Sequence, residues 1–338
     1  MKSRYSIVMQ GAILCQDGTL DPAVINNIKT VRQSFSDAEL IISTWNVSND
    51  IRCEMDTLSE RYSLLILYNE DPGAISSIDG VVSSNVNRMI LSTKNGVEVS
   101  NGEFVIKIRT DSNLYNDNIR CILSHLMGSR INKKRNNNYK IFENYVINCN
   151  LFARDVRGYL PYLFHPGDIC LAGTKKDLLL LFDIPLADRH IFMNVYRACF
   201  LSFMKYVPEQ YIWIKCIENK IDEIIYAGNQ SYNNSVVNDS EHYYINNFLA
   251  LSPQQMGFSW PKHESVYNNK GQYSVYSLND WKKLYNKCNN KYFTVDKKKL
   301  FIKSQITIFM TLYFFVRTCI LKVPLFRKIA ISLFRKRG

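Results

Sequence analysis

The residue with the clearest chemical potential is Asp111, which closes the segment Arg109-Thr110-Asp111 directly after an apolar, strand-like run at 103–108. A carboxylate just past a central strand can bind a divalent ion that neutralises a leaving diphosphate, because hard oxygen ligands suit Mg²⁺ and Mn²⁺. Asp111 also fits a structural role, as the N-cap of a helix around 114–127 or as a turn residue. The residues alone leave both roles open.

A second acidic residue, Glu209, lies at the start of a later predicted helix, within Pro208-Glu209-Gln210. In that position a carboxylate stabilises the helix dipole, which is a structural role. Upstream of this helix, a turn-rich segment at 164–168 contains His165 and Asp168. These residues extend the set of candidates for a functional site.

The motifs of several large enzyme classes are absent from the sequence. It contains no GxxxxGK[ST] phosphate loop, GxGxxG dinucleotide turn, GxSxG nucleophile elbow or HExxH zinc helix. ATPases, dehydrogenases, serine hydrolases and zinc proteases are therefore disfavoured.

The first 110 residues alternate strand-like and helix-like stretches. We expect strands at 5–9, 39–43, 63–68 and 103–108, and helices at 22–35 and 85–91. Asp21 and Pro22 supply an N-cap and a first helical residue for the first of these helices. The alternation predicts a mostly parallel sheet with crossover helices, whose ligands bind beyond the carboxyl ends of the strands. The residues at these ends are Gln10-Gly11, Thr44-Trp45, Asp71-Pro72-Gly73 and Arg109-Thr110-Asp111.

The pattern is less regular after residue 128. Strands are expected at 141–148 and 150–154, and helices at 177–182, 191–206 and 208–218. Two polar stretches, 129–139 and 228–240, are interpreted as loops, the second of them mobile.

Composition and charge limit the class of protein. The chain has 338 residues, 46% of them hydrophobic and 21% charged, which is enough to bury a substantial core. The net charge of +12 is uneven, because residues 297–338 contain eleven basic and no acidic residues while the rest is nearly neutral. A uniformly basic protein that binds nucleic acid is therefore disfavoured, and the charge points to a function of the C-terminal segment.

The nine cysteines and the N-terminus indicate the compartment. The cysteines are scattered without CxxC spacing, which is typical of a reducing cytosol rather than of a disulfide framework. The apolar run at 7–9 stops at Gln10 and is too short for a secretory signal. We therefore expect a cytoplasmic protein.

Several blocks of the sequence resemble the WavE lipopolysaccharide-synthesis family. The blocks are SIVMQG (6–11), ELIISTW (39–45), DPG (71–73), NVNRMILSTKNGV (85–97), FVIKIRTD (104–111), HPGD (165–168) followed by KKDLLLLF (175–182), and PEQYIW (208–213). The resemblance spans about residues 5–215, in order, and implies a bacterial enzyme of surface-polysaccharide assembly with a glycosyltransferase A-type fold. That fold is an α/β, Rossmann-type, mostly parallel central sheet flanked by helices.

The resemblance also implies where a nucleotide sugar binds. Gln10, Gly11 and Thr44 fall where such folds hold the nucleoside. The acidic motif, usually Asp-x-Asp, is reduced here to Arg109-Thr110-Asp111, so Asp111 is the remaining metal ligand for Mg²⁺ or Mn²⁺. Arg109 is expected to compensate part of the diphosphate charge.

Further site residues are implied in the same way. Arg88 is a second candidate for the diphosphate, with a solvated helix face as its alternative role. Glu209 lies 98 residues after Asp111 (209 − 111 = 98), a separation at which inverting enzymes of this fold carry the general base. Asp168 is the rival base or a ligand of acceptor hydroxyls, and His165 is an acceptor contact or a packed loop residue.

These implications together predict a glycosyltransferase. It would move a hexose or N-acetylhexosamine, with inversion, from a nucleotide sugar (UDP-linked) to a lipid-linked saccharide in O-antigen, lipopolysaccharide or capsule synthesis. The alternatives are a nucleotidyl- or sugar-phosphate transferase and a non-enzymatic protein that binds membrane surfaces. Residues 1–295 would form the catalytic domain, with a nucleotide-sugar half at 1–112 and an acceptor half at 113–295.

The remaining segment, 296–338, is interpreted as a basic amphipathic membrane-association segment. Its apolar run from Ile306 to Val316 is bounded by Lys303 and Arg317, which is short of the roughly 20 apolar residues that a bilayer span needs. A helix lying in the interface of an anionic membrane fits better, and this would place the protein on the cytoplasmic face of the inner membrane. The alternative is a helix that packs on the catalytic domain.

Overall fold

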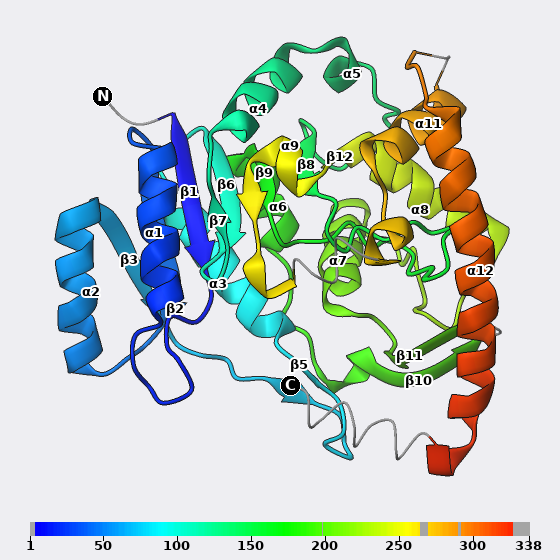
Figure 1. Ribbon diagram of the computed structural model, residues 1–338, viewed down its shortest axis with the longest axis horizontal. Coiled ribbons are helices and arrows are strands. Elements are labelled where there is room, and N and C mark those ends of the chain that lie inside the picture. The colour runs from blue at the N-terminus through cyan, green and yellow to red at the C-terminus, as the bar shows by residue number, and fades with distance from the viewer. Residues whose placement is uncertain (1–3, 198, 264–269, 290–291, 327–338) are drawn as a thin grey trace.

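A single sheet of seven strands organises the described part of the protein. The computed structural model describes residues 4–197, 199–263, 270–289 and 292–326. Within these residues the strand order is β12-β8-β9-β6-β1-β2-β3 (Figure 1). The strands are β1 (Tyr5–Gln10), β2 (Glu39–Trp45), β3 (Leu64–Asn69), β6 (Phe104–Arg109), β8 (Val146–Cys149), β9 (Leu171–Thr174) and β12 (Phe248–Leu251).

All neighbouring strands in this sheet are parallel except the two pairs formed by β9. The carboxyl ends of six strands therefore lie at one edge of the sheet. Because β9 runs in the opposite direction, the segment that precedes it reaches the same edge. This reversal brings residues just before 171 next to the end of β6.

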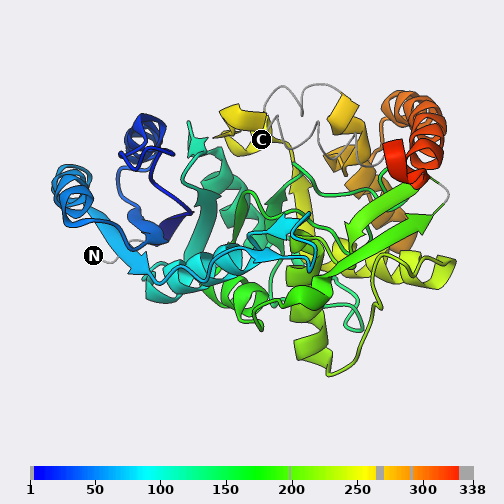
Figure 2. The ribbon, with the colours of Figure 1, turned by 90° about the horizontal axis from the view of Figure 1, so that it is seen from below.

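Helices cover both faces of the sheet. They are α1 (Pro22–Ser34), α2 (Asn49–Tyr62), α3 (Val86–Val99), α4 (Asn118–Gly128), α5 (Arg130–Lys133), α6 (Lys175–Phe182), α7 (Pro208–Ile221), α8 (Asn234–Asn247), α9 (Pro253–Met256), α11 (Leu278–Cys288) and α12 (Lys297–Lys322). Helices α1 and α2 lie on one face, and α3, α6 and α7 pack together on the other (Figure 2). This division between the two faces follows from right-handed crossovers. The chain moves outward from β1 to β3 and then returns to β6, so the crossover helices before and after the return cover opposite faces of the sheet.

Short elements complete the chain around the sheet. These are the two-residue strands β4 (Ile75–Ser76), β5 (Ser83–Ser84), β7 (Asn113–Leu114) and β13 (Phe258–Ser259), the hairpin β10 (Phe192–Arg197) and β11 (Phe200–Met204), and the 3₁₀ turns η1 (Arg189–Ile191), η2 (Pro261–His263) and η3 (Lys270–Ser274).

The predicted α/β fold with a mostly parallel sheet and flanking helices is confirmed. The first helix begins as expected, because Asp21 Oδ1 accepts a hydrogen bond of 2.8 Å from the amide of Ala23 and Pro22 occupies the first position. Every residue of β1 is buried. The strands β8, β9 and β12 of the expected acceptor half continue the same sheet, so the division at residue 112 stays a prediction.

Several local predictions are wrong. The expected helix at 191–206 is the β10–β11 hairpin, because Phe200, Ser202 and Met204 alternate inward with a period of two. The stretch 150–154 forms turns and a single bridge rather than a strand. The expected loops at 129–139 and 228–240 contain α5 and the start of α8, each capped by a polar side chain that precedes it, Ser129 or Asn233.

Candidate active site

The end of β6 carries an arginine bound to a carboxylate. Arg109 donates from Nε to Asp111 Oδ1 at 2.8 Å and from Nη2 to Oδ2 at 2.9 Å. Burial favours the neutral acid, but the hydrogen bonds and charge of Arg109 prevail and hold the pKa of Asp111 below its ordinary value. Asp111 lies in the turn after β6, whereas Asp117 precedes α4. The helix-capping alternative for Asp111 is therefore wrong.

A buried ion pair lies beneath this edge. Lys107, in the middle of β6, is fully buried, and its Nζ donates to the backbone oxygen of Asp168 and lies 3.2 Å from Asp168 Oδ2. Burial lowers the pKa of Lys107, and the charge of Asp168 opposes this shift. Among the described residues, the second carboxylate oxygen of Asp168, Oδ1, is buried and has no hydrogen-bond partner. Such an atom is available to a polar group of a ligand.

Glu209 enters the same site from the first turn of α7. The turn is fixed by Pro208 and by Gln210, whose Oε1 accepts from the amide of Val207 at 3.1 Å. Glu209 Oε2 lies 3.5 Å from His165 Nε2. Burial, and next the charge of Asp168, raise the pKa of Glu209 to about 7. A carboxyl group with this pKa exchanges protons near neutral pH, as a general base must.

Two buried groups flank Glu209. Burial, and next the charge of Arg154, hold the pKa of His165 well below its ordinary value, so the imidazole is neutral at pH 7. Arg154 donates to Ser274 Oγ at 2.6 Å, while its buried Nε has no partner among the described residues. The charge of Arg154 also lowers the pKa of Glu209, although burial outweighs it. His165, Asp168 and Glu209 therefore share one electrostatic environment.

The residues predicted to bind the diphosphate and the residues predicted to act as a base come together here. Among the causes that raise the pKa of Arg109, after burial and Asp111, are the charges of Asp168 and Glu209. The Arg109–Asp111 pair thus lies within electrostatic reach of both candidate bases. Sequence reasoning missed Lys107 and Arg154. A lysine in the middle of the apolar strand FVIKIR was a signal for Lys107, whereas Arg154 follows a turn and gave none.

The residues expected at the nucleoside lie at the ends of β1 and β2. Gln10 is buried and its Oε1 accepts a hydrogen bond from Ser92 Oγ at 2.7 Å. Gly11 follows with a φ of +125°, and its amide donates to Ser43 O at 3.0 Å. Thr44 is buried, and its hydroxyl has no partner among the described residues.

Arg88 stands apart from Arg109. It donates from Nε to Asp71 Oδ1 at 2.7 Å and from Nη2 to Asp71 Oδ2 at 2.5 Å, beyond the end of β3. Its own helix brings it near Gln10, because the backbone oxygen of Arg88 accepts from the same Ser92 hydroxyl. Arg88 is therefore at the correct sheet edge but already engaged by a carboxylate.

The donor set defines what kind of metal this site fits. In the described part of the chain, no three His, Cys, Asp or Glu side chains are grouped so that they could hold an ion. Asp111 is an ionised carboxylate that accepts a hydrogen bond from Arg109 on each oxygen and retains further lone pairs. One carboxylate fits a Mg²⁺ or Mn²⁺ ion that arrives with a diphosphate, rather than an ion held by the protein alone.

Gly11→Ala is expected to destabilise the protein by about 1–3 kcal/mol, because the residue keeps a positive φ that L side chains rarely adopt. The added Cβ would also lie 3.2 Å from Thr110 Oγ1. Urea denaturation measures the change. Gly128→Ala at the end of α4 is the control, since its Cβ meets nothing within 4 Å. Equal stabilities of the two variants would contradict the assignment of strain to Gly11.

Lys107→Met is expected to lower the free energy of unfolding by about 3–5 kcal/mol, because Asp168 would remain buried without its counter-charge. The double variant Lys107→Met/Asp168→Leu removes both charges and should recover most of this loss. Urea denaturation of the two variants and the wild type measures the difference. An unchanged midpoint for Lys107→Met would show that the pair does not contribute as described.

The fold and this site together define an α/β protein with a mostly parallel sheet, with acidic and basic side chains gathered at the carboxyl edge of that sheet. The chain belongs to the WavE lipopolysaccharide synthesis family, whose sequence model matches residues 5–314. The family expected from the sequence is thus confirmed, and the match reaches beyond the blocks quoted above into α12. No curated protein matches the chain.

Solved structures that are similar to the chain are distant. The match to S. aureus TarS covers 88% of this chain and 45% of the TarS chain, at 10% identity and a TM-score of 0.36. A cytidylyltransferase from Leptospira borgpetersenii matches 55% of this chain and 66% of its own at 11% identity and a TM-score of 0.33. The mannosyltransferase PcManGT from Pyrobaculum calidifontis, solved with GDP-Man and Mn²⁺, matches 56% of this chain and 51% of its own at 9% identity and a TM-score of 0.31. The chain thus spans two thirds or less of each of these proteins.

Proposed function

We propose that the protein is an inverting glycosyltransferase that moves a hexose or N-acetylhexosamine from a UDP-sugar to a hydroxyl of a lipid-linked saccharide. The pathway would be bacterial O-antigen, lipopolysaccharide or capsule synthesis, in keeping with the family. The observation that carries the proposal is Glu209, a carboxyl group with a pKa of about 7 beside Asp168 and within electrostatic reach of the Arg109–Asp111 pair.

In the proposed reaction, Glu209 takes the proton of the acceptor hydroxyl while the hydroxyl oxygen attacks the anomeric carbon. The bond between that carbon and the diphosphate oxygen breaks, and UDP leaves with the electron pair. A base with a pKa near neutral is deprotonated in a useful fraction of molecules and still accepts a proton. The neutral His165 and the unpartnered oxygen of Asp168 would bind acceptor hydroxyls. Asp168 is the rival base.

The donor would lie along the ends of β1, β2 and β6. Gln10, Gly11 and Thr44 would contact the nucleoside, where a glycine lets the ligand approach the backbone closely. Arg109 and Arg88 would face the diphosphate. Asp111 would hold the Mg²⁺ or Mn²⁺ ion that accompanies it. Such an ion, when bound, neutralises charge on the leaving group.

The proposed location is the cytoplasmic face of the inner membrane, where lipid-linked acceptors are built. Peripheral attachment would be through the C-terminal segment, whose helix α12 is exposed and apolar. Catalysis would then occur next to the surface that contains the acceptor lipid.

A donor screen tests this function. Purified protein is incubated with UDP-, GDP- and CMP-sugars and a short lipid-like acceptor, and products are analysed by mass spectrometry and NMR. We expect a new glycosidic bond with inverted anomeric configuration and release of UDP. A phosphodiester product with release of monophosphate or pyrophosphate would instead identify a nucleotidyl- or sugar-phosphate transferase. Absence of nucleotide diphosphate binding would favour a non-enzymatic membrane-surface protein.

A further inference from the structure

Helix α12 presents its apolar side chains outward, away from the catalytic domain. Its exposed residues include a stripe that we call the outer face, made of Phe301, Ile308, Phe309, Leu312, Val316 and Ile320. The opposite side of the helix faces the protein: Met310 and Thr318 are buried, and Phe314 stacks on Tyr159 with ring centroids 5.6 Å apart. In Figure 1, α12 runs along one whole side of the molecule, past α11 and the β10–β11 hairpin. A helix that only completes a soluble core has the reverse arrangement.

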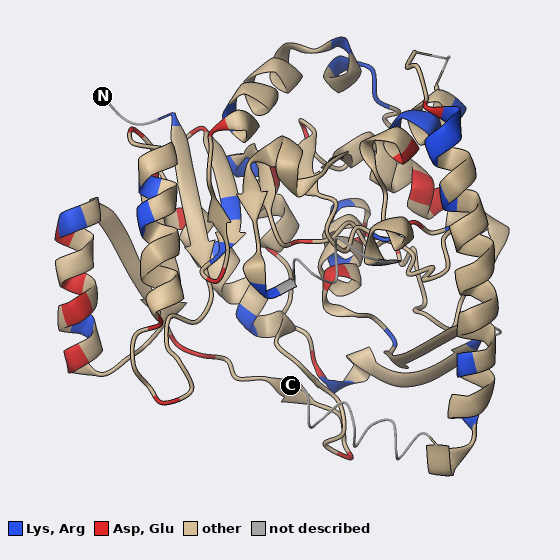
Figure 3. Ribbon diagram, in the orientation of Figure 1, with Lys and Arg blue, Asp and Glu red and all other residues tan. Residues whose placement is uncertain are grey.

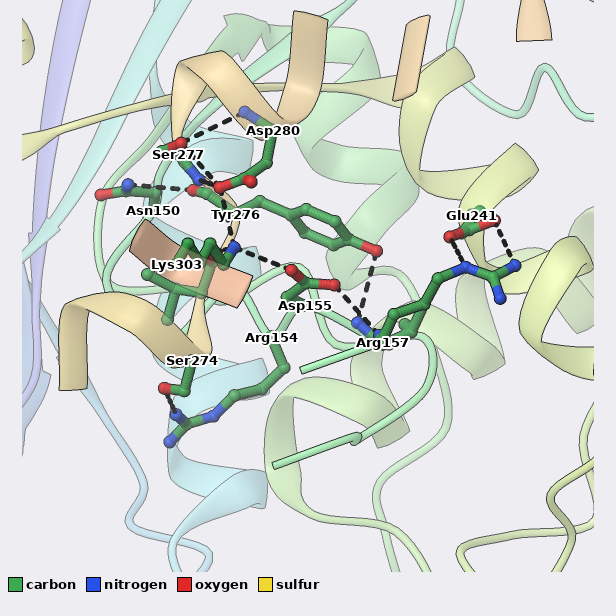
Figure 4. Close-up of polar contacts among 12 residues, drawn as sticks. Asn150, Arg154, Asp155, Arg157, Glu241, Ser274, Tyr276, Ser277, Asp280 and Lys303 are labelled. Atoms are coloured by element: carbon green, nitrogen blue, oxygen red, sulfur yellow. Dashed lines mark hydrogen bonds and ion pairs between the residues drawn. The ribbon is translucent and has the colours of Figure 1, made fainter. Parts of the chain in front are cut away.

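The inner side of α12 is fixed to the domain by Lys303. Its Nζ lies 2.7 Å from Asp155 Oδ2 and 2.8 Å from Asp280 Oδ2, and it donates to Val275 O at 2.9 Å (Figure 4). The ammonium group thereby engages three acceptors with its three protons. A largely buried cation between two carboxylates fixes a position along the helix more narrowly than apolar packing does.

The Lys303 contact is next to the candidate site in the sequence. Asp155 follows Arg154, and Arg154 forms a bridge with Val275, the residue whose carbonyl accepts from Lys303. Figure 4 shows Asp155, Arg154 and Lys303 gathered between the same chain segments. The orientation of α12 is therefore coupled to the segment that carries one of the cations next to Glu209.

The contacts of α12 with the domain decide whether this helix crosses a bilayer or lies on its surface. With 26 residues and a helical rise of about 1.5 Å per residue, α12 has the length and composition of a membrane span. Its inner side, however, contacts the domain from Lys303 to Thr318. A crossing helix would carry Lys303, Asp155, Asp280 and the irregular backbone around them to membrane depth, where ionisable side chains and lipid-exposed irregular backbone are costly.

The charge distribution identifies the surface that the outer face fits. Lys297, Lys298 and Lys299 begin the helix and Lys322 ends it (Figure 3). The charged residues between them are Lys303, which is paired with the domain, and Arg317, whose guanidinium lies over the ring of Phe314. The sequence contains no acidic residue after Asp296. An apolar face between basic ends is the pattern of helices that lie at the boundary of headgroups and acyl chains in anionic membranes.

We infer that α12 is an in-plane membrane helix, clamped to the catalytic domain by Lys303, whose outer face inserts into an anionic lipid surface. The inference adds to the proposed function a defined orientation of the domain on the bilayer. Binding to lipid does not depend on sugar transfer, so the two can fail independently. Because the clamp joins α12 to the Arg154 segment, the site is held at a fixed height above the membrane.

Vesicle flotation of the full chain tests the membrane contact. We expect the wild type to float with phosphatidylglycerol/phosphatidylcholine vesicles and to bind pure phosphatidylcholine more weakly. Leu312→Asp/Val316→Asp should lower the partition coefficient on anionic vesicles at least tenfold. The matched control is Ile78→Asp/Ile224→Asp, which changes two apolar residues that are 94% and 85% exposed outside α12. Equal flotation of both double variants overturns the inference.

A depth measurement separates an in-plane helix from a crossing one. Single variants Phe301→Trp, Phe309→Trp and Val316→Trp are bound to vesicles of lipids brominated at shallow or deep acyl positions. We expect all three to be quenched more strongly by the shallow label and to a similar extent, after subtraction of the wild-type signal. Quenching that deepens from Phe301 toward the middle of the helix would indicate a span, and no quenching would indicate no insertion. Either result overturns the inference, whatever the donor screen yields.

Discussion

Glu209→Gln is expected to lower the rate of sugar transfer by about 10²–10⁴-fold while donor binding stays intact, because the amide cannot take a proton from the acceptor. The wild-type rate should rise with pH through about 7 and then level off, since burial and Asp168 raise the pKa of Glu209 to about 7 and the base works only when deprotonated. The variant should lose this inflection. Transfer rates across pH 5.5–9, with titration of UDP by calorimetry, measure both effects.

Glu218→Gln is the matched control for this experiment. Glu218 lies on the same helix, and its partner is Lys215 at 2.7 Å, within the same helix. It should retain the wild-type rate and the wild-type inflection. If Glu209→Gln also keeps both, Glu209 is not the base, and Asp168→Asn becomes the decisive variant.

Asp111→Asn is expected to lower transfer by about 10²–10³-fold, because it removes the charge that would hold a cation on the leaving diphosphate. The same change should abolish the effect of Mn²⁺ on UDP affinity. For the wild type we expect calorimetry to give tighter UDP binding with Mn²⁺ than with EDTA, and for Asp111→Asn equal affinities. This second measurement reports on the ion without relying on turnover.

Asp37→Asn is the matched control, because it also removes an arginine-bound carboxylate but at a position outside the candidate site. Asp37 Oδ1 accepts from Arg120 at 2.6 Å, at the amino side of β2 and away from the strand ends that form the site. We expect wild-type transfer and a wild-type Mn²⁺ effect. An Asp111→Asn enzyme that behaves like Asp37→Asn would remove Asp111 from the donor site.

Much of the first half of the fold could be predicted because its signals are local. The alternation of strand and helix stretches up to residue 110, the Asp21-Pro22 helix start and the strand-end position of Asp111 all follow from neighbouring residues. Predictions failed where a local pattern fits two structures. The segment 191–206 contains helix-compatible apolar residues, yet pairing of β10 with β11 buries its alternate side chains.

The candidate site depends on distant residues and could be predicted only in part. His165 and Glu209 come within 3.5 Å across more than forty residues of chain, and Lys107 meets Asp168 because β9 runs against its neighbours. No local pattern encodes the direction of β9. The pKa of Glu209 likewise follows from burial and from Asp168, which only the folded chain supplies.

The C-terminal segment shows most clearly what the composition of the sequence determines and what only the tertiary structure determines. The sequence by itself determined that residues 297–338 are basic, free of acidic residues and rich in apolar side chains, because composition needs no fold. Only the tertiary structure decided which side of α12 meets the protein. Lys303, which interrupts the apolar run in the sequence, turns inward to Asp155 and Asp280. The paired charge is thereby withdrawn from the surface, and the exposed side chains of the outer face are mostly apolar.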